Sequence, residues 1–175
     1  VSTQGPFEVR HFCSEILVSA DGRFVAFTSL SPNLVPGDLD SDADVFVRDC
    51  RTGFVDRVSL GVNGAQPTAW SGQPSLSADG RYVCFTSAAD NLVSGDTNGV
   101  ADVFVFDRLS HAMVRASVSS GGFEGNGDSS SPRISATGRY VVFTSQASNL
   151  VPGDTNGYSD VFLHDLQTGL TERVS

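Results

Sequence analysis

Three acidic segments carry the residue types best suited to binding chemistry. Each segment has a side-chain oxygen at its first, third and seventh positions; the nine residues are Asp38, Asp40, Asp44, Asp96, Asn98, Asp102, Asp154, Asn156 and Asp160. Ca²⁺ takes about six to eight oxygen ligands, and a tight loop with Asp or Asn at alternate positions supplies several of them. The spacing therefore predicts three calcium loops, and Ca²⁺ is the one cofactor that the sequence indicates.

A second interpretation of these segments needs no metal. Asp and Asn side chains cap turns through their own backbone, and Asn98-Gly99 and Asn156-Gly157 are common turn dipeptides. The fifth position holds no Asp or Asn in the second and third segments, and no glutamate closes the loops as it does in an EF-hand. Both interpretations, the calcium loop and the structural turn, stay open at this point.

The sequence contains no recognisable arrangement of catalytic residues. His11, His111 and His164 each occur in one repeat only, without metal-ligand spacing, and no Gly-x-Ser-x-Gly nucleophile elbow is present. No glutamate occupies an equivalent position in all three repeats, and paired carboxylates for glycoside chemistry stay open as an alternative. We therefore predict no catalytic residues and a non-enzymatic role.

The acidic segments belong to a repeat with a period of 58 residues. The stretch 21–49 returns without gaps as 79–107 and as 137–165. Self-similarity at a fixed period is the signature of a repeat architecture. We divide the 175 residues into a single array of three repeats, approximately 1–59, 60–117 and 118–175.

Each repeat predicts four short strands and no amphipathic helix. The second strand, at 23–28, 81–86 and 139–144, is apolar on both of its faces, whereas a strand with one solvated face alternates apolar and polar residues. Both faces of each small sheet must therefore be covered by neighbouring sheets. Four-stranded antiparallel sheets packed in this way make a β-propeller, so the predicted fold class is all-β.

The motifs of the repeat resemble those of a known family. S-A-D-G-R-Y-V-x-F-T-S, then D-V-F-V-x-D and x-T-G-x-x-x-R-V-S, are similar to the TolB-like β-propeller repeat of bacterial envelope and secreted proteins. The turn departs from the usual family pattern, which has Pro where Ala20, Ala78 and Ala136 stand and Asp where Thr137 stands. The resemblance implies a secreted or periplasmic protein, and it implies either a partner-binding module or an accessory domain of a peptidase.

The number of blades raises the question of a partner. The resemblance implies six blades, and propellers usually close with about four to eight, whereas this chain supplies three. We expect two chains to assemble head to tail into one six-bladed ring, as a homodimer; a fragment of a longer chain is the alternative.

The expected function is a binding or scaffold module that presents loops to a protein or carbohydrate ligand. A calcium-stabilised adhesion or lectin-like module, or the propeller domain of a larger secreted hydrolase, stays open.

The net charge limits the possible partners, and the positions of the cysteines bear on whether a disulfide can form. The net charge is −9 and the pI is near 4.5, so the surface should repel nucleic-acid phosphates and we expect no nucleic-acid partner. No apolar run is long enough to span a membrane. Cys84 lies in an apolar strand and is expected to be a small buried hydrophobe. Cys13 and Cys50 can form a disulfide only if folding brings them together.

Overall fold

The computed structural model describes residues 13–39 and 41–175, which form twelve β-strands and one short 3₁₀ turn, η1 (Val62–Gly64). The strands of the first repeat are β1 (Cys13–Val18), β2 (Phe24–Ser29), β3 (Asp44–Asp49) and β4 (Val55–Arg57). Those of the second are β5 (Ser71–Leu76), β6 (Tyr82–Ser87), β7 (Asp102–Asp107) and β8 (Ala112–Arg115). Those of the third are β9 (Ser129–Ile134), β10 (Tyr140–Ser145), β11 (Asp160–Asp165) and β12 (Thr171–Arg173).

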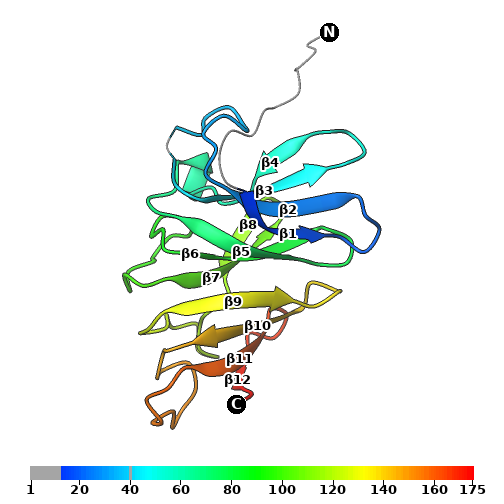
Figure 1. Ribbon diagram of the computed structural model, residues 1–175. Coiled ribbons are helices and arrows are strands. Elements are labelled where there is room, and N and C mark those ends of the chain that lie inside the picture. Colours follow the sequence, from blue (N-terminus) through cyan, green and yellow to red (C-terminus); the bar gives the residue numbers. More distant parts are fainter. Residues whose placement is uncertain (1–12, 40) are drawn as a thin grey trace.

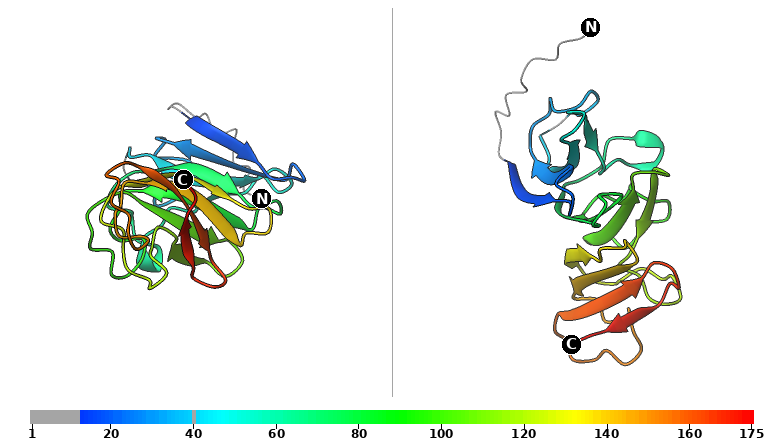
Figure 2. Two further views of the ribbon diagram at one scale, coloured as in Figure 1. Left: turned by 90° about the horizontal axis from the view of Figure 1, so that it is seen from below. Right: turned by 90° about the vertical axis from the view of Figure 1, so that its right-hand side faces the viewer.

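The strands form three separate antiparallel sheets of four, ordered β1-β2-β3-β4, β5-β6-β7-β8 and β9-β10-β11-β12. The sheets are stacked as successive blades, from the blue β1 to the red β12 (Figure 1), and the other two views in Figure 2 show them fanned about a common side. The first strands of neighbouring blades contact each other, whereas the fourth strands lie at the rim. The predicted all-β propeller with three four-stranded blades is confirmed.

The apolar core lies between the blades. One cluster joins Ala26 and Val47 of the first blade to Val83, Phe85 and other side chains of the second. The other joins the opposite face of the second blade, including Cys84 and Val105, to the third blade. Strand β6 therefore sends alternate side chains into two different cores, which is why its sequence is apolar on both faces.

The first strand of each blade has an irregularity that the sequence did not predict. Its pairing with the second strand shifts register at Glu15, Gln73 and Ser131, which have φ angles of 55°, 56° and 54°. Non-glycine residues in this left-handed region cost of order 1 kcal/mol or more, so the surrounding structure must hold them there. At two of the three positions contacts between blades supply that restraint: the Gln73 side chain accepts a hydrogen bond from the Ser131 N–H at 2.8 Å, and the Glu15 side chain accepts one from the Gln73 N–H at 2.5 Å.

The three cysteines are free thiols. Cys84 is fully buried, and burial raises the pKa of its thiol to about 12, as expected for a small core residue. Cys13 pairs with Ser29 at one end of β2, while the Cys50 N–H bonds to the Arg23 carbonyl at the other end. A strand rises about 3.3 Å per residue, so Cys13 and Cys50 are too far apart for a disulfide.

Candidate functional site

Each acidic segment surrounds an arginine that enters from the fourth strand of its blade. In the second blade, Arg115 Nη1 lies 2.9 Å from Asp96 Oδ1 and 3.0 Å from Asp102 Oδ2. Arg115 Nη2 lies 2.5 Å from Glu124 Oε1, and the arginine side chain is only 9% exposed. The guanidinium therefore supplies a positive charge at the place where the sequence predicted a cation.

Several other atoms of this cluster are also hydrogen-bonded. Asn98 Nδ2 donates to Asp102 Oδ2 at 2.8 Å and to the Gly125 carbonyl at 3.0 Å. The Ser117 hydroxyl donates to the other oxygen of Asp102. Burial raises the pKa of Asp96, while hydrogen bonds from Thr97 and then Arg115 lower the pKa of Glu124. In this blade the third position thus serves as an amide donor to the seventh.

The same arrangement recurs in the first and third blades. Arg57 Nη1 lies 3.2 Å from Asp38 and 3.0 Å from Asp44. Arg173 Nη1 lies 3.0 Å from Asp154 and 3.6 Å from Asp160, and Asn156 donates to Asp160 at 2.7 Å. Asp40 lies outside the described residues.

The structure thus brings the first and seventh positions together around an arginine. Within residues 13–39 and 41–175, no cluster of three or more His, Cys, Asp or Glu side chains suits a metal ion. The calcium sites stay a prediction, and a cation would have to displace a guanidinium. Sequence reasoning missed the arginines, although Arg57, Arg115 and Arg173 recur at the period of the repeat.

A second set of arginine–carboxylate pairs joins the second and third strands at the other end of each blade. The guanidinium nitrogens of Arg23, Arg81 and Arg139 lie 2.8, 2.7 and 2.6 Å from the carboxylates of Asp49, Asp107 and Asp165. Each of these arginines also lies over the aromatic ring of the next residue, at 4.6 to 4.8 Å from its centre. Hydrogen bonds from the arginines hold the pKa of all three carboxyl groups well below the ordinary range.

These lowered pKa values predict a loss of stability in acid. A carboxyl whose pKa is lower in the folded than in the unfolded chain adds stability above its unfolded pKa of about 3.9, and that stability is lost as the pH falls toward the folded value. We expect the free energy of unfolding, measured by urea titration, to fall steadily below about pH 4. An Asp107→Asn variant should lose less over the same interval, since one titrating group is gone. An acid limb of equal slope in both proteins would contradict this assignment.

The histidines occupy structural positions. His164 is buried, its Nδ1 lies 2.8 Å from the Thr171 hydroxyl, and burial lowers its pKa. His111 stands in the turn before β8, with its ring edge against Phe106. His11 lies outside the described residues. The Thr171 hydroxyl donates its proton to the Val118 carbonyl at 2.5 Å, so it accepts rather than donates in its contact with His164.

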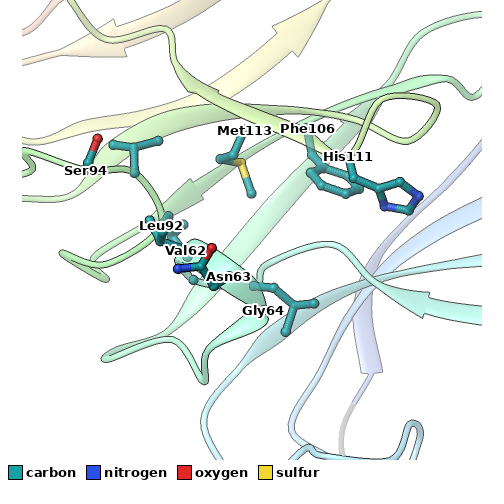
Figure 3. Close-up of a pocket in the computed structure, with 11 residues that line it drawn as sticks. Val62, Asn63, Gly64, Leu92, Ser94, Phe106, His111 and Met113 are labelled. Atoms are coloured by element: carbon teal, nitrogen blue, oxygen red, sulfur yellow. The ribbon is translucent and has the colours of Figure 1, made fainter.

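Two grooves at the rim lie at equivalent positions of successive blades. The first, of about 600 Å³, is lined by η1, the Leu92–Ser94 segment, Phe106, His111 and Met113 (Figure 3). The second, of about 590 Å³, is lined by the corresponding segment Asn33–Pro36 and by Phe54 and Val55 beside β4. Ligand sites are typically concave and mostly apolar with a few polar groups, and both grooves fit this description.

Three comparisons place the fold among known proteins. No protein-family model and no curated relative matches the sequence. Among solved structures, TolB from Acinetobacter baumannii is 19% identical with a TM-score of 0.60, over 95% of this chain and 33% of that one. A protein from Agrobacterium tumefaciens described as TolB is 18% identical with a TM-score of 0.59, over 97% and 50%. The β-propeller domain of the Trilobed protease from Pyrococcus furiosus is 13% identical with a TM-score of 0.60, over 92% and 41%.

The chain spans between about a third and a half of the length of these three proteins. In the described part of the chain no helix could cross a membrane. The three-bladed topology, together with these likenesses along nearly the whole chain, shows that the protein has the TolB-like β-propeller fold.

Proposed function

We propose that this chain is a non-enzymatic propeller module that binds a protein partner through the grooves at its rim. The observation that carries the proposal is the recurrence of a groove of nearly 600 Å³ on two successive blades. The two grooves share three pairs of equivalent apolar residues, Leu92 with Leu34, Val93 with Val35 and Met113 with Val55, so they present related apolar walls one blade apart. An extended segment of a partner could place side chains in both.

The chemistry of the lining favours apolar side chains over sugars. Leu92, Val93, Phe106 and Met113 form the wall of the second-blade groove, and Asn63 and His111 supply polar groups at its edge. Methionine is flexible and fills irregular contacts, a property used in surfaces that accept varied partners. A sugar would find a better platform at Trp70, which is 43% exposed beside a smaller hollow of about 270 Å³.

The place of action follows from the resemblance to the TolB-like repeat. That repeat occurs in envelope and secreted proteins, so we include a periplasmic or secreted location in the proposal. The acidic composition is consistent with a basic partner surface, because complementary charge speeds association.

A displayed library of random peptides and a glycan array test the proposal on the purified chain. We expect peptides with apolar side chains to be enriched and a Met113→Glu substitution to abolish their binding. A Leu109→Glu variant is the matched control, since Leu109 is 74% exposed on the same blade and does not line the groove. Both variants are first checked for folding by circular dichroism.

The opposite pattern would overturn the choice of partner. If only glycans bound, and Trp70→Ala removed that binding while Met113→Glu did not, the ligand would be a carbohydrate at the smaller hollow. The library and the array are run in chelator and in millimolar Ca²⁺, so that a calcium-dependent lectin would be recognised directly.

A further inference from the structure

The two ends of the blade array differ from its two internal junctions in a way that points to a partner. We propose that a second copy of this chain closes on the first head to tail, so that the two arrays form one six-bladed ring. The surfaces concerned are the exposed face of the first blade and the exposed face of the third blade. They are separate from the rim grooves, so this proposal does not depend on the one above.

The internal junctions show which contacts hold neighbouring blades together. The Ala20 N–H bonds to the Ala78 carbonyl at 3.0 Å, and the Ala78 N–H bonds to the Ala136 carbonyl at the same distance. A second contact of this kind runs from the Ser71 N–H to the Ala43 carbonyl, and it recurs between the second and third blades at Ser129. Each junction thus repeats the same pairs of backbone groups.

The ends of the array carry the unmatched halves of these pairs. The next Ala–Ala bond in the series would need the Ala136 N–H on the third blade and the Ala20 carbonyl on the first. The next bond equivalent to Ser71 N–H to Ala43 carbonyl would need the Cys13 N–H on the first blade and the Ser159 carbonyl on the third. Within residues 13–39 and 41–175 there is no further blade to complete either contact. The third blade therefore has the Ala136 N–H and the Ser159 carbonyl, and the first blade has the Ala20 carbonyl and the Cys13 N–H that would pair with them.

Each end of the array also exposes apolar side chains whose counterparts are buried at the internal junctions. On the first blade Ile16 and Val18 are 68% and 60% exposed, whereas Ile134, the counterpart of Val18 on the third blade, is 9% exposed in a junction core. On the third blade Val142 and Leu163 are only half-buried, although their counterparts on the other two blades are fully buried. A second copy would cover both surfaces at once.

An aromatic ring and a glycine form the most specific of these matches. A Cβ on Gly80 would lie 2.4 Å from the ring of Phe24 on the preceding blade, and one on Gly138 would lie 2.1 Å from the ring of Tyr82. Gly22, the equivalent glycine of the first blade, has nothing within 4 Å, and Tyr140, the equivalent ring of the third, is 36% exposed. Tyr140 of one copy would pack on Gly22 of the other.

The count of blades agrees with two copies. Two chains provide six blades, inside the range of about four to eight in which propellers close. A ring of two identical halves has cyclic two-fold symmetry, the commonest form among soluble oligomers, and both of its new junctions are the same.

Light scattering behind size exclusion tests the proposal. We expect the purified chain at micromolar concentration to have the mass of two chains of 18.4 kDa each. A Val18→Asp substitution should raise the dissociation constant at least about a hundredfold, since it places an unpaired carboxylate in the new core. A Leu109→Asp substitution, at another exposed apolar residue away from both ends, should leave the mass unchanged.

Glycine substitutions provide a matched second test. Gly22 and Gly53 both lie in the first blade, with φ angles of 73° and 78°, and a Cβ on either would meet nothing within 4 Å. Gly22→Ala and Gly53→Ala should therefore strain the single chain equally, and only Gly22→Ala should weaken the dimer. A mass of one chain for the wild type, or equal dimer affinity for the two glycine variants and for Val18→Asp, would overturn the proposal.

Discussion

Replacing Arg115 with alanine should lower the free energy of unfolding by about 3–5 kcal/mol, because it leaves buried carboxylates without a counter-charge. The guanidinium is the shared partner of Asp96, Asp102 and Glu124, and the first two side chains are 4% and 0% exposed. Burial already raises the pKa of Asp96 with the arginine present. The measurement is urea unfolding at neutral pH, compared between wild type and variant.

An exposed arginine on another blade provides the control. Arg51 lies in the turn after β3 and is exposed, so Arg51→Ala should change the free energy of unfolding by no more than about 0.5 kcal/mol. An Arg115→Ala loss as small as that of Arg51→Ala would mean that water reaches the carboxylates and that the ion pairs are not the cause of stability.

The same variants test the calcium prediction. Addition of millimolar Ca²⁺ should leave the melting temperature of the wild type unchanged while Arg115 occupies the carboxylate cluster. In Arg115→Ala a cation can replace the missing charge, so Ca²⁺ should recover part of the lost stability. A wild-type melting temperature that rises with Ca²⁺ and falls with chelator would instead support the predicted calcium loops.

Replacing Gly138 with alanine should be the other strongly destabilising change. The φ of 76° costs any L-residue about 1–2 kcal/mol, and the new Cβ would lie 2.1 Å from the Tyr82 ring, so overpacking adds about 1–3 kcal/mol. Gly169 is in the same blade with a φ of 75°, and a Cβ there meets nothing within 4 Å. Gly169→Ala should therefore show the backbone cost alone.

A double-mutant cycle separates the two contributions of Gly138. In a Tyr82→Ala background the ring is gone, so Gly138→Ala should cost no more than Gly169→Ala. If the cost of Gly138→Ala were the same with and without the ring, the glycine would be required for its turn only. The junction between the second and third blades would then depend on other contacts.

The periodicity of the sequence was sufficient to predict the blades. The predicted second strands at 23–28, 81–86 and 139–144 agree within one residue with β2, β6 and β10. Apolar residues on both faces of these strands predicted burial between neighbouring sheets, and Val83 and Cys84 lie in two different cores. These features were predictable because strand period and two-sided burial follow from local residue order.

The backbone of the first strands was not predictable in the same way. Glu15, Gln73 and Ser131 share one left-handed conformation although they are three different residue types, none of them glycine. In two of the three, bonds between blades hold the conformation: the Ser131 N–H donates to Gln73, and the Gln73 N–H donates to Glu15. Residue type at one position carries no signal of a restraint that comes from the neighbouring blade.

Residue order alone predicts a three-bladed array, its strands and the recurrence of acidic segments every 58 residues. The partner of those carboxylates is visible only once the chain is folded. Asp96 and Asp102 are 19 and 13 residues from Arg115 along the chain, and Glu124 lies beyond it. The physical reason is that carboxylates attract a metal ion and a guanidinium alike, so residue type gives the charge of the partner, whereas the antiparallel pairing of β7 with β8 brings in the arginine itself.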